Sequence, residues 1–165
     1  MKDLHGFLKI EPVSRFQHPL FNLLEFRFFA ASERGKALVF GNPPLLMLLF
    51  IVPYVLVGEI AHFRGKRFFV KLGKRIVGIL VLKAGHKAIV IGSLAVSPLC
   101  REFGVGLFML RWIEERCRRM NEEWLELSVL KGNVPAQRLY YRFGFRKAAE
   151  RRWSFVLRKR VGNIV

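Results

Sequence analysis

A short segment with two glycines, Arg101-Glu102-Phe103-Gly104-Val105-Gly106, constrains the fold more than any other feature of the chain. The apolar run over residues 88–96 predicts a strand before it, and the pattern after residue 106 predicts a helix. Glycine adopts backbone conformations closed to other residues and lets a bulky group approach the main chain. The first N–H groups of a helix lack intrahelical partners and carry the positive end of the helix dipole. The segment therefore predicts either a phosphate-binding turn or an ordinary strand-to-helix turn.

A second block begins at Asn133 and reads N-x-x-A-x-x-L-Y-x-x-x-G-F, from Asn133 to Phe145. Asparagine is a favoured N-cap and Pro135 suits a first helical turn, so a helix is predicted to begin here and to end at Gly144. Between the two blocks there is room for a helix to about Met120 and a strand over residues 124–130. A return strand from Phe145 and a final strand over residues 153–157 are predicted after it.

Upstream, the pattern predicts a first strand over residues 4–13 and a helix that starts at His18-Pro19 and ends at Gly35. A hairpin is predicted from strands 68–72 and 76–83, joined at Gly73-Lys74, and Gly85-His86 leads into strand 88–96. Three adjacent antiparallel strands result. With 165 residues, 52% of them hydrophobic, we expect one α+β domain spanning residues 1–165.

The two blocks together resemble the GNAT acyltransferase superfamily over roughly residues 75–145. The resemblance implies a GNAT-like acyl-CoA N-acyltransferase fold of the α+β class, with a mixed, mostly antiparallel central sheet flanked by helices. It implies acetyl-CoA as the cofactor and a direct attack by a primary amine. The residues that it implies at the cofactor are Leu94, Ala95 and Val96 along the pantetheine arm, Arg101, Glu102, Phe103, Gly104, Val105 and Gly106 at the pyrophosphate, and Asn133 and Tyr140.

In that family a tyrosine beside the thioester sulfur acts as general acid, and Tyr140 matches its position. The pKa of a phenol, ordinarily near 10, is close to that of an alkyl thiol. The phenol can therefore donate a proton as charge develops on the sulfur. The alternative for Tyr140 is a half-buried aromatic on an amphipathic helix.

The general base is where the sequence departs from the family. Members often carry a glutamate on the strand before the turn or on the strand before the Asn helix, but residues 88–96 have none and Ser128 stands on the second strand. Glu126, two residues earlier and on the same strand face, is the candidate base. Other candidates are Glu59, His62 and His86, and the alternatives are a water chain as the base and a structural role for Glu126. The histidines are too scattered to predict a metal site.

The chain is strongly basic, with 29 Lys and Arg against 12 Asp and Glu and a formal net charge of +17. No acidic residue lies between Glu59 and Glu102, where nine basic residues occur. The interpretations are a solvated basic face, attraction of CoA or an acidic substrate, or weak contact with nucleic acid or an acidic protein. In the helix after the glycines, the charged residues predict a solvated face.

Residues 37–58 are uncharged, which meets the length criterion for a membrane span. Pro43, Pro44 and Pro53 interrupt them, so we expect a buried segment or an exposed patch, for a homodimer or a membrane surface, in place of a transmembrane helix. No cleavable signal opens the chain, and Cys100 and Cys117 lie about 20 Å apart along a helix, too far for a disulfide. We therefore expect a cytoplasmic protein.

The sequence thus predicts an N-acetyltransferase that moves an acetyl group from acetyl-CoA to a primary amine. The acceptor could be a protein N-terminus or lysine, a polyamine or a small metabolite. The alternative is a catalytically weak, basic binding module on the same fold, for nucleic acid or an acidic protein.

Overall fold

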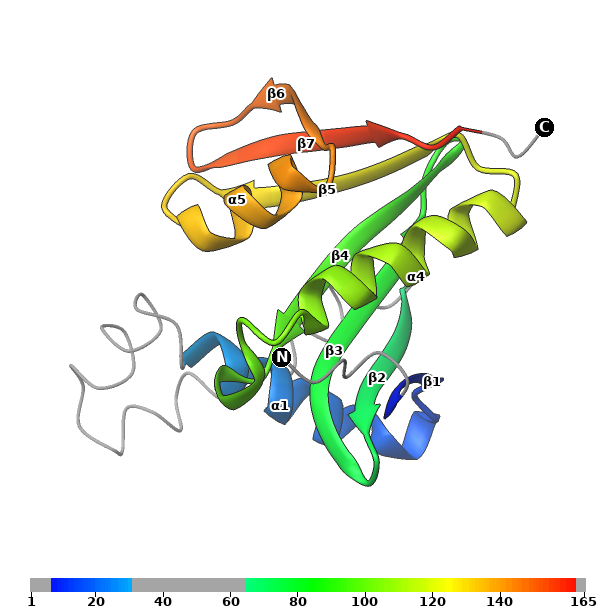
Figure 1. The fold of residues 1–165 in the computed structure, drawn as a ribbon, viewed down its shortest axis with the longest axis vertical. Helices are drawn as coiled ribbons and strands as arrows, with labels where there is room; N and C mark the ends of the chain where they lie inside the picture. The colour runs from blue at the N-terminus through cyan, green and yellow to red at the C-terminus, as the bar shows by residue number, and fades with distance from the viewer. Residues whose placement is uncertain (1–6, 31–64, 163–165) are drawn as a thin grey trace.

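The computed structural model describes residues 7–30 and 65–162. These residues form a seven-stranded sheet in the order β1-β2-β3-β4-β5-β7-β6, flanked by three α-helices (Figure 1). The strands are β1 (Leu8–Pro12), β2 (Lys66–Leu72), β3 (Arg75–Ala84), β4 (Ala88–Val96), β5 (Trp124–Leu130), β6 (Arg146–Glu150) and β7 (Ser154–Arg160). The helices are α1 (His18–Ala30), α4 (Val105–Arg119) and α5 (Val134–Arg142), and short 3-10 turns span Arg15–Gln17 and Pro98–Cys100.

All strand pairs are antiparallel except β4 with β5, so the mixed, mostly antiparallel sheet predicted from the sequence is confirmed. The three adjacent antiparallel strands β2, β3 and β4 are also as predicted. Gly73, with φ of 59°, turns the chain between β2 and β3, a conformation that glycine adopts without steric cost. The predicted end of the first helix and the uncharged residues 37–58 lie outside the described residues.

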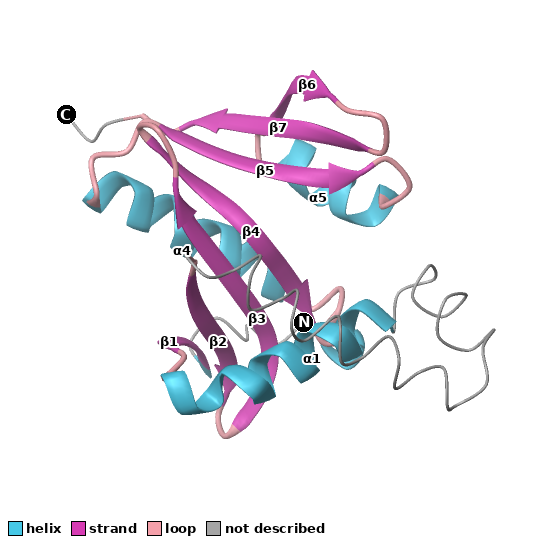
Figure 2. Ribbon diagram, turned by 180° about the vertical axis from the view of Figure 1, so that it is seen from behind, coloured by secondary structure: helices cyan, strands magenta, loops and turns pink. Residues whose placement is uncertain are grey.

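The central feature of the sheet is a fork between β4 and β5. The two strands pair only from Ala88 to Ile91 and from Trp124 to Leu127. A register shift between β3 and β4 leaves Gly92 as an extra residue, and such a bulge bends a strand and increases its twist. Beyond it β4 and β5 diverge, so that β1–β4 form one arm of the molecule and β5, β7 and β6 form the other (Figures 1 and 2).

Helices cover the two faces of the first arm, because alternate residues of a strand point to opposite sides. On β3, Leu80 and Leu82 belong to the large core that includes α4 residues and Tyr140 of α5. Ile79 and Val81 belong to a second core that includes Phe21 of α1. Helices α4 and α5 therefore lie on one face of the sheet and α1 lies on the other.

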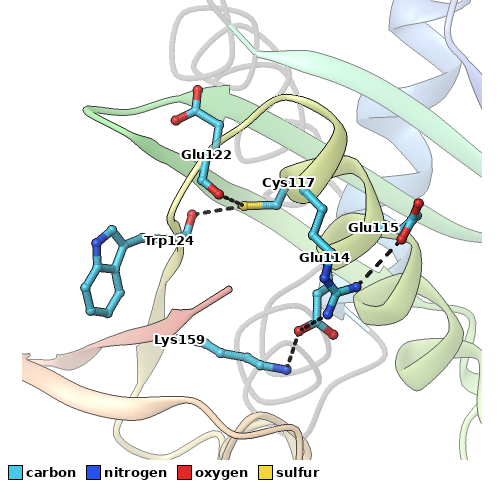
Figure 3. Close-up of polar contacts among 7 residues, drawn as sticks. Glu114, Glu115, Cys117, Glu122, Trp124 and Lys159 are labelled. Carbon is cyan, nitrogen blue, oxygen red and sulfur yellow. Dashed lines mark hydrogen bonds and ion pairs between the residues drawn. The ribbon is translucent and has the colours of Figure 1, made fainter. Parts of the chain in front are cut away.

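Polar contacts of Glu114 and Cys117 connect α4 to the rest of the fold (Figure 3). The Glu114 carboxylate lies 2.8 Å from Lys159 Nζ on β7 and 3.1 Å from Arg118 on its own helix. At the other end, the buried Cys117 thiol lies 3.3 Å from the carbonyl oxygen of Glu122. The prediction that the charges of this helix form a solvated face is wrong for Glu114, whose side chain is only 15% exposed, because β7 packs beside it.

Within residues 7–30 and 65–162, no helix is both long enough and apolar enough to cross a membrane.

Candidate active site at the fork of the sheet

The chain leaves β4 at Val96, passes through a short 3-10 turn and enters α4 through a tight loop. Glu102 and Gly104 both have positive φ, 67° and 78°. Gly104 is the N-cap, and its carbonyl accepts the first helical hydrogen bond from the Phe108 amide at 2.9 Å. No side chain caps this helix, and its first turn holds no acidic residue. Among the described residues, no side chain therefore caps the first N–H groups of α4, and such groups can receive an anion.

Gly104 and Gly106 have different structural roles. Gly104 has the unusual backbone conformation that the sequence predicts, but Gly106 lies inside α4 and has no positive φ. A Cβ at Gly106 would lie 3.0 Å from Leu139 Cδ2 of α5 and 4.0 Å from Val96 Cγ2 of β4. Gly106 thus allows α4, α5 and the end of β4 to approach closely.

The other residues of the loop separate into solvent-exposed and core positions. Arg101, Glu102 and Phe103 are exposed, and Phe103 retains 60% of its accessible surface. Val105 is 2% exposed and packs in the main core, so its side chain anchors the first turn of α4. Only the backbone of Val105 can contact a ligand.

Strand β4 offers a free edge beside this loop. Leu94, Ala95 and Val96 pair with Leu80, Ile79 and Gly78 of β3 on one side, but they have no β5 partner on the other. Each of the three β4 residues is partly exposed. The unpaired backbone groups of this edge can hydrogen-bond an extended ligand that carries amides, in the manner of an added strand.

Helix α5 borders the same region. The Asn133 side chain accepts a hydrogen bond from the Ala136 amide at 3.4 Å and so caps the helix. Tyr140, one turn from its end, is 7% exposed and packs edge-on against Phe145, with ring centroids 5.8 Å apart. Burial raises the pKa of the Tyr140 hydroxyl from 10.0 to about 12. At neutral pH this phenol therefore holds its proton.

Glu126 lies apart from Tyr140. On β5, Leu125 and Leu127 point into the core that contains Tyr140, so Glu126 and Ser128 face the opposite side of the sheet. Glu126 is in the segment still paired with β4, opposite Val90, whereas Ser128 is the first residue beyond the last pair. Glu126 Oε2 lies 3.0 Å from Arg158 Nε of β7. This ion pair engages a carboxylate oxygen of Glu126 with the neighbouring strand.

The remaining sequence candidates lie elsewhere or outside the described residues. His86 is exposed in the β3–β4 turn, at the closed end of the fork. Glu59 and His62 fall in the part of the chain that is not described. Among the described residues, no group of three or more His, Cys, Asp or Glu is arranged to hold a metal ion.

Leu139, a residue of the second sequence block, sets the distance between α4 and α5. Arg158, which pairs with Glu126, was not predicted from the sequence. For Arg158 the available signal was weak, because the β5–β7 register depends on contacts distant in the sequence.

The described part of the chain thus combines a helix start without a side-chain cap, an edge of β4 without a β5 partner and a buried phenol. The family model described as "Acetyltransferase (GNAT) family" matches residues 48–145. The chain therefore belongs to the GNAT acetyltransferase family, as the sequence motifs predicted, and this family uses acetyl-CoA.

Solved structures share this fold at low sequence identity. The ribosomal-protein-S18-alanine N-acetyltransferase from Escherichia coli is 15% identical, with 96% of each chain covered and a TM-score of 0.66. PaiA N-acetyltransferase from Thermoplasma acidophilum, in complex with coenzyme A, is 15% identical over 93% of this chain and 98% of that one, with a TM-score of 0.70. A GNAT acetyltransferase from Elizabethkingia anophelis with acetyl-CoA bound is 16% identical, covers 93% and 98%, and has a TM-score of 0.64. No curated protein sequence matches the chain.

Proposed function

We propose that this protein transfers an acetyl group from acetyl-CoA to a primary amine in a direct attack, with Tyr140 as the general acid. The observation that carries the proposal is the meeting of the two motifs at the fork. Gly106 of the first motif and Leu139, the neighbour of Tyr140 in the second, are in contact. The start of α4 therefore lies beside α5, the helix that carries Tyr140, which supports a single site formed from both motifs.

The residues have separate roles in this proposal. Acetyl-CoA supplies the activated thioester. The N–H groups at the start of α4, with Arg101 nearby, bind the phosphates, because they combine free donors with the positive end of the helix dipole. The backbone of Leu94–Val96 pairs with the pantetheine amides and aligns the thioester along β4. Asn133 fixes the start of α5 and thereby the position of Tyr140.

Tyr140 donates its proton to the departing sulfur. A pKa of about 12 keeps the phenol protonated at neutral pH but makes it a weaker acid than an exposed tyrosine. The same burial penalises charge on the sulfur, so the proton affinities of the two groups rise together. The amine's proton leaves either to Glu126 or to a chain of water molecules. The ion pair of Glu126 with Arg158 and its place on the opposite face of the sheet support water.

The cofactor site is tested by calorimetric titration of CoA into a Gly104→Glu variant. We expect affinity to fall at least about tenfold, because a carboxylate then occupies the place of the phosphates. Gly73→Glu is the matched control, since Gly73 also has a positive φ, lies in the β2–β3 turn and has no atom within 4 Å of its Cβ position. Equal affinities in the two variants would contradict the proposed site.

The chemical role is tested by Tyr140→Phe, with Tyr141→Phe as the control one residue away on an exposed side chain. We expect lower turnover in Tyr140→Phe with unchanged acetyl-CoA affinity, since the variant deletes a proton donor and keeps the ring. Release of CoA thiol is measured with a polyamine, lysine and peptides with free N-termini. Wild-type turnover in Tyr140→Phe would assign Tyr140 to packing. Binding of CoA without turnover on any of these amines would favour the binding module.

A further inference from the structure

The second arm of the sheet has a face that no described helix covers. Helix α5 lies behind β5 and β7, and Figure 2 shows the opposite face of β5, β7 and β6 open to the viewer. We call it the arginine face and define it by Trp124, Arg146, Arg158 and Arg160 on the strands, together with Arg152 and Trp153 of the β6–β7 turn at its end. Arg146, Arg152 and Arg160 are exposed, and Trp153 retains 68% of its accessible surface.

Like charges lie opposite each other on this face. Arg146 of β6 is the register partner of Arg158 of β7, and paired residues of an antiparallel ladder share a face. Like charges directly opposite one another destabilise a sheet. The acid in this row is Glu126, which pairs with Arg158 alone. The row therefore keeps an excess of positive charge at a cost in stability.

The excess extends over the whole arm. Residues 124–160 contain ten Lys and Arg and two acidic residues, Glu126 and Glu150. Glu150 is already paired with Lys131 and Lys147. In the described part of the chain, no carboxylate pairs with Arg146, Arg152 or Arg160. These three arginines thus remain available to an anionic partner.

Three cations of the acid-free stretch seen in the sequence are already engaged. Lys71 pairs with Glu11, and Lys87 lies 3.4 Å from Glu123. Arg67 is 5% exposed, and its guanidinium lies over the Phe21 ring. Part of the positive charge of this stretch is therefore already paired or buried.

Two arginines of this face are stacked on its tryptophans. The guanidinium of Arg158 lies 5.0 Å from the ring centroid of Trp124, and that of Arg152 lies 5.0 Å from the ring centroid of Trp153. Nucleic-acid bases stack on aromatic rings and on guanidinium planes, whereas phosphates attract the same cations. An acidic peptide would use the charges but not the exposed rings.

We propose that the arginine face binds single-stranded nucleic acid. Trp153 is the stacking platform, and Arg146, Arg152 and Arg160 contact phosphates. Because this face lies on the side of the sheet opposite α5 and Tyr140, it does not overlap the proposed cofactor site, and the binding proposal does not rest on the proposed acetyl transfer. The failure of one proposal therefore leaves the other standing.

The test is fluorescence anisotropy with a labelled single-stranded oligothymidylate at several salt concentrations. The logarithm of the affinity for a single strand falls linearly with the logarithm of the salt concentration, with a slope of about 0.7 per phosphate contacted. In Arg146→Gln/Arg160→Gln we expect the slope to become shallower by about 1.4 and the affinity at low salt to fall at least about tenfold. The matched control, Lys74→Gln/Arg75→Gln, removes the same charge from the exposed β2–β3 turn of the other arm and should bind like wild type.

Stacking is tested separately with Trp153→Ala, for which we expect about tenfold weaker binding, while Trp153→Phe keeps a ring and should retain most of the affinity. Saturating CoA should leave binding unchanged. Melting temperatures and CoA affinity show that each variant is folded.

Four results would overturn the proposal. They are no binding at low salt, equal losses in the control and the arginine variants, competition by CoA, and tighter binding of polyglutamate than of oligothymidylate at equal salt. Competition would place the oligonucleotide at the start of α4, and the polyglutamate result would indicate an acidic protein as the partner.

Discussion

A Cβ on Gly106 would lie 3.0 Å from Leu139 Cδ2, so the absence of a side chain at residue 106 sets how closely α4 approaches α5. The two residues are 33 positions apart and belong to the two motifs that identify the family. Their close approach places the start of α4, where we propose that the phosphates bind, beside the helix that carries the buried phenol of Tyr140.

Gly106→Val should destabilise the fold by about 1–3 kcal/mol, because the added methyl groups force α4 and α5 apart. The same change should weaken CoA binding, since the start of α4 moves with the helix. Urea denaturation of Gly106→Val, Leu139→Ala and the double variant measures the coupling. We expect the valine to cost less in the Leu139→Ala background, where space is available. Additive costs would show that the two side chains do not compete for the same volume.

Gly104 should respond to substitution for a different reason. Its φ of 78° lies in the left-handed region, so Gly104→Val should destabilise by about 1–2 kcal/mol or more. Gly104→Asn should be less costly, because asparagine tolerates this region better and can also act as an N-cap. Thermal unfolding of both variants tests this order. Equal losses would mean that the left-handed conformation at residue 104 is not what limits the choice of residue.

Much of the fold could be predicted from local signals. The hairpin of β2 and β3 follows from a glycine turn between apolar runs, and α4 and α5 follow from their periods and from Asn133 as a cap. The extent of pairing between β4 and β5 could not be predicted, because it depends on a one-residue bulge at Gly92 that has no strong local signature.

Some features of the candidate site could likewise be predicted from the sequence, and others could not. The positive φ of Gly104 and the placement of Tyr140 on α5 could be predicted from motifs. The function of Gly106 could not, because the contact that it permits is with Leu139 on another helix. The face to which Glu126 points, and its pairing with Arg158, required the β5–β7 register, which the sequence does not contain locally.

The Glu114–Lys159 pair should contribute more to stability than the other ion pairs of α4. Both side chains are largely buried, 15% and 18% exposed, and the Lys159 ammonium lies 3.9 Å from the Phe143 ring centroid. Lys159→Met leaves the Glu114 carboxylate with Arg118 alone and should cost about 1–3 kcal/mol. Arg119→Met, which breaks an exposed pair with Glu115, should cost less than about 0.5 kcal/mol. Urea denaturation compares the two, and equal costs would contradict this ranking.

Tyr140 should make the stability of the fold depend on pH in the alkaline range. Burial raises its pKa in the folded state to about 12 from an ordinary value of 10.0, so the folded protein favours the protonated phenol. The stability that this preference provides is fully present below pH 10 and is lost as pH rises toward 12, because only the unfolded chain releases the proton freely. Two pKa units correspond to about 2.7 kcal/mol at the upper end of this range.

The measurement compares urea denaturation of the wild type and Tyr140→Phe between about pH 9 and pH 11.5. Other groups titrate there, including Cys117, whose pKa is raised to about 11, but they are common to both proteins and cancel in the difference. We expect the wild type to lose stability relative to Tyr140→Phe above pH 10, while Tyr141→Phe follows the wild type. Parallel curves for the wild type and Tyr140→Phe would show that the Tyr140 hydroxyl is solvated in the folded protein, and a solvated phenol would not remain protonated above its ordinary pKa.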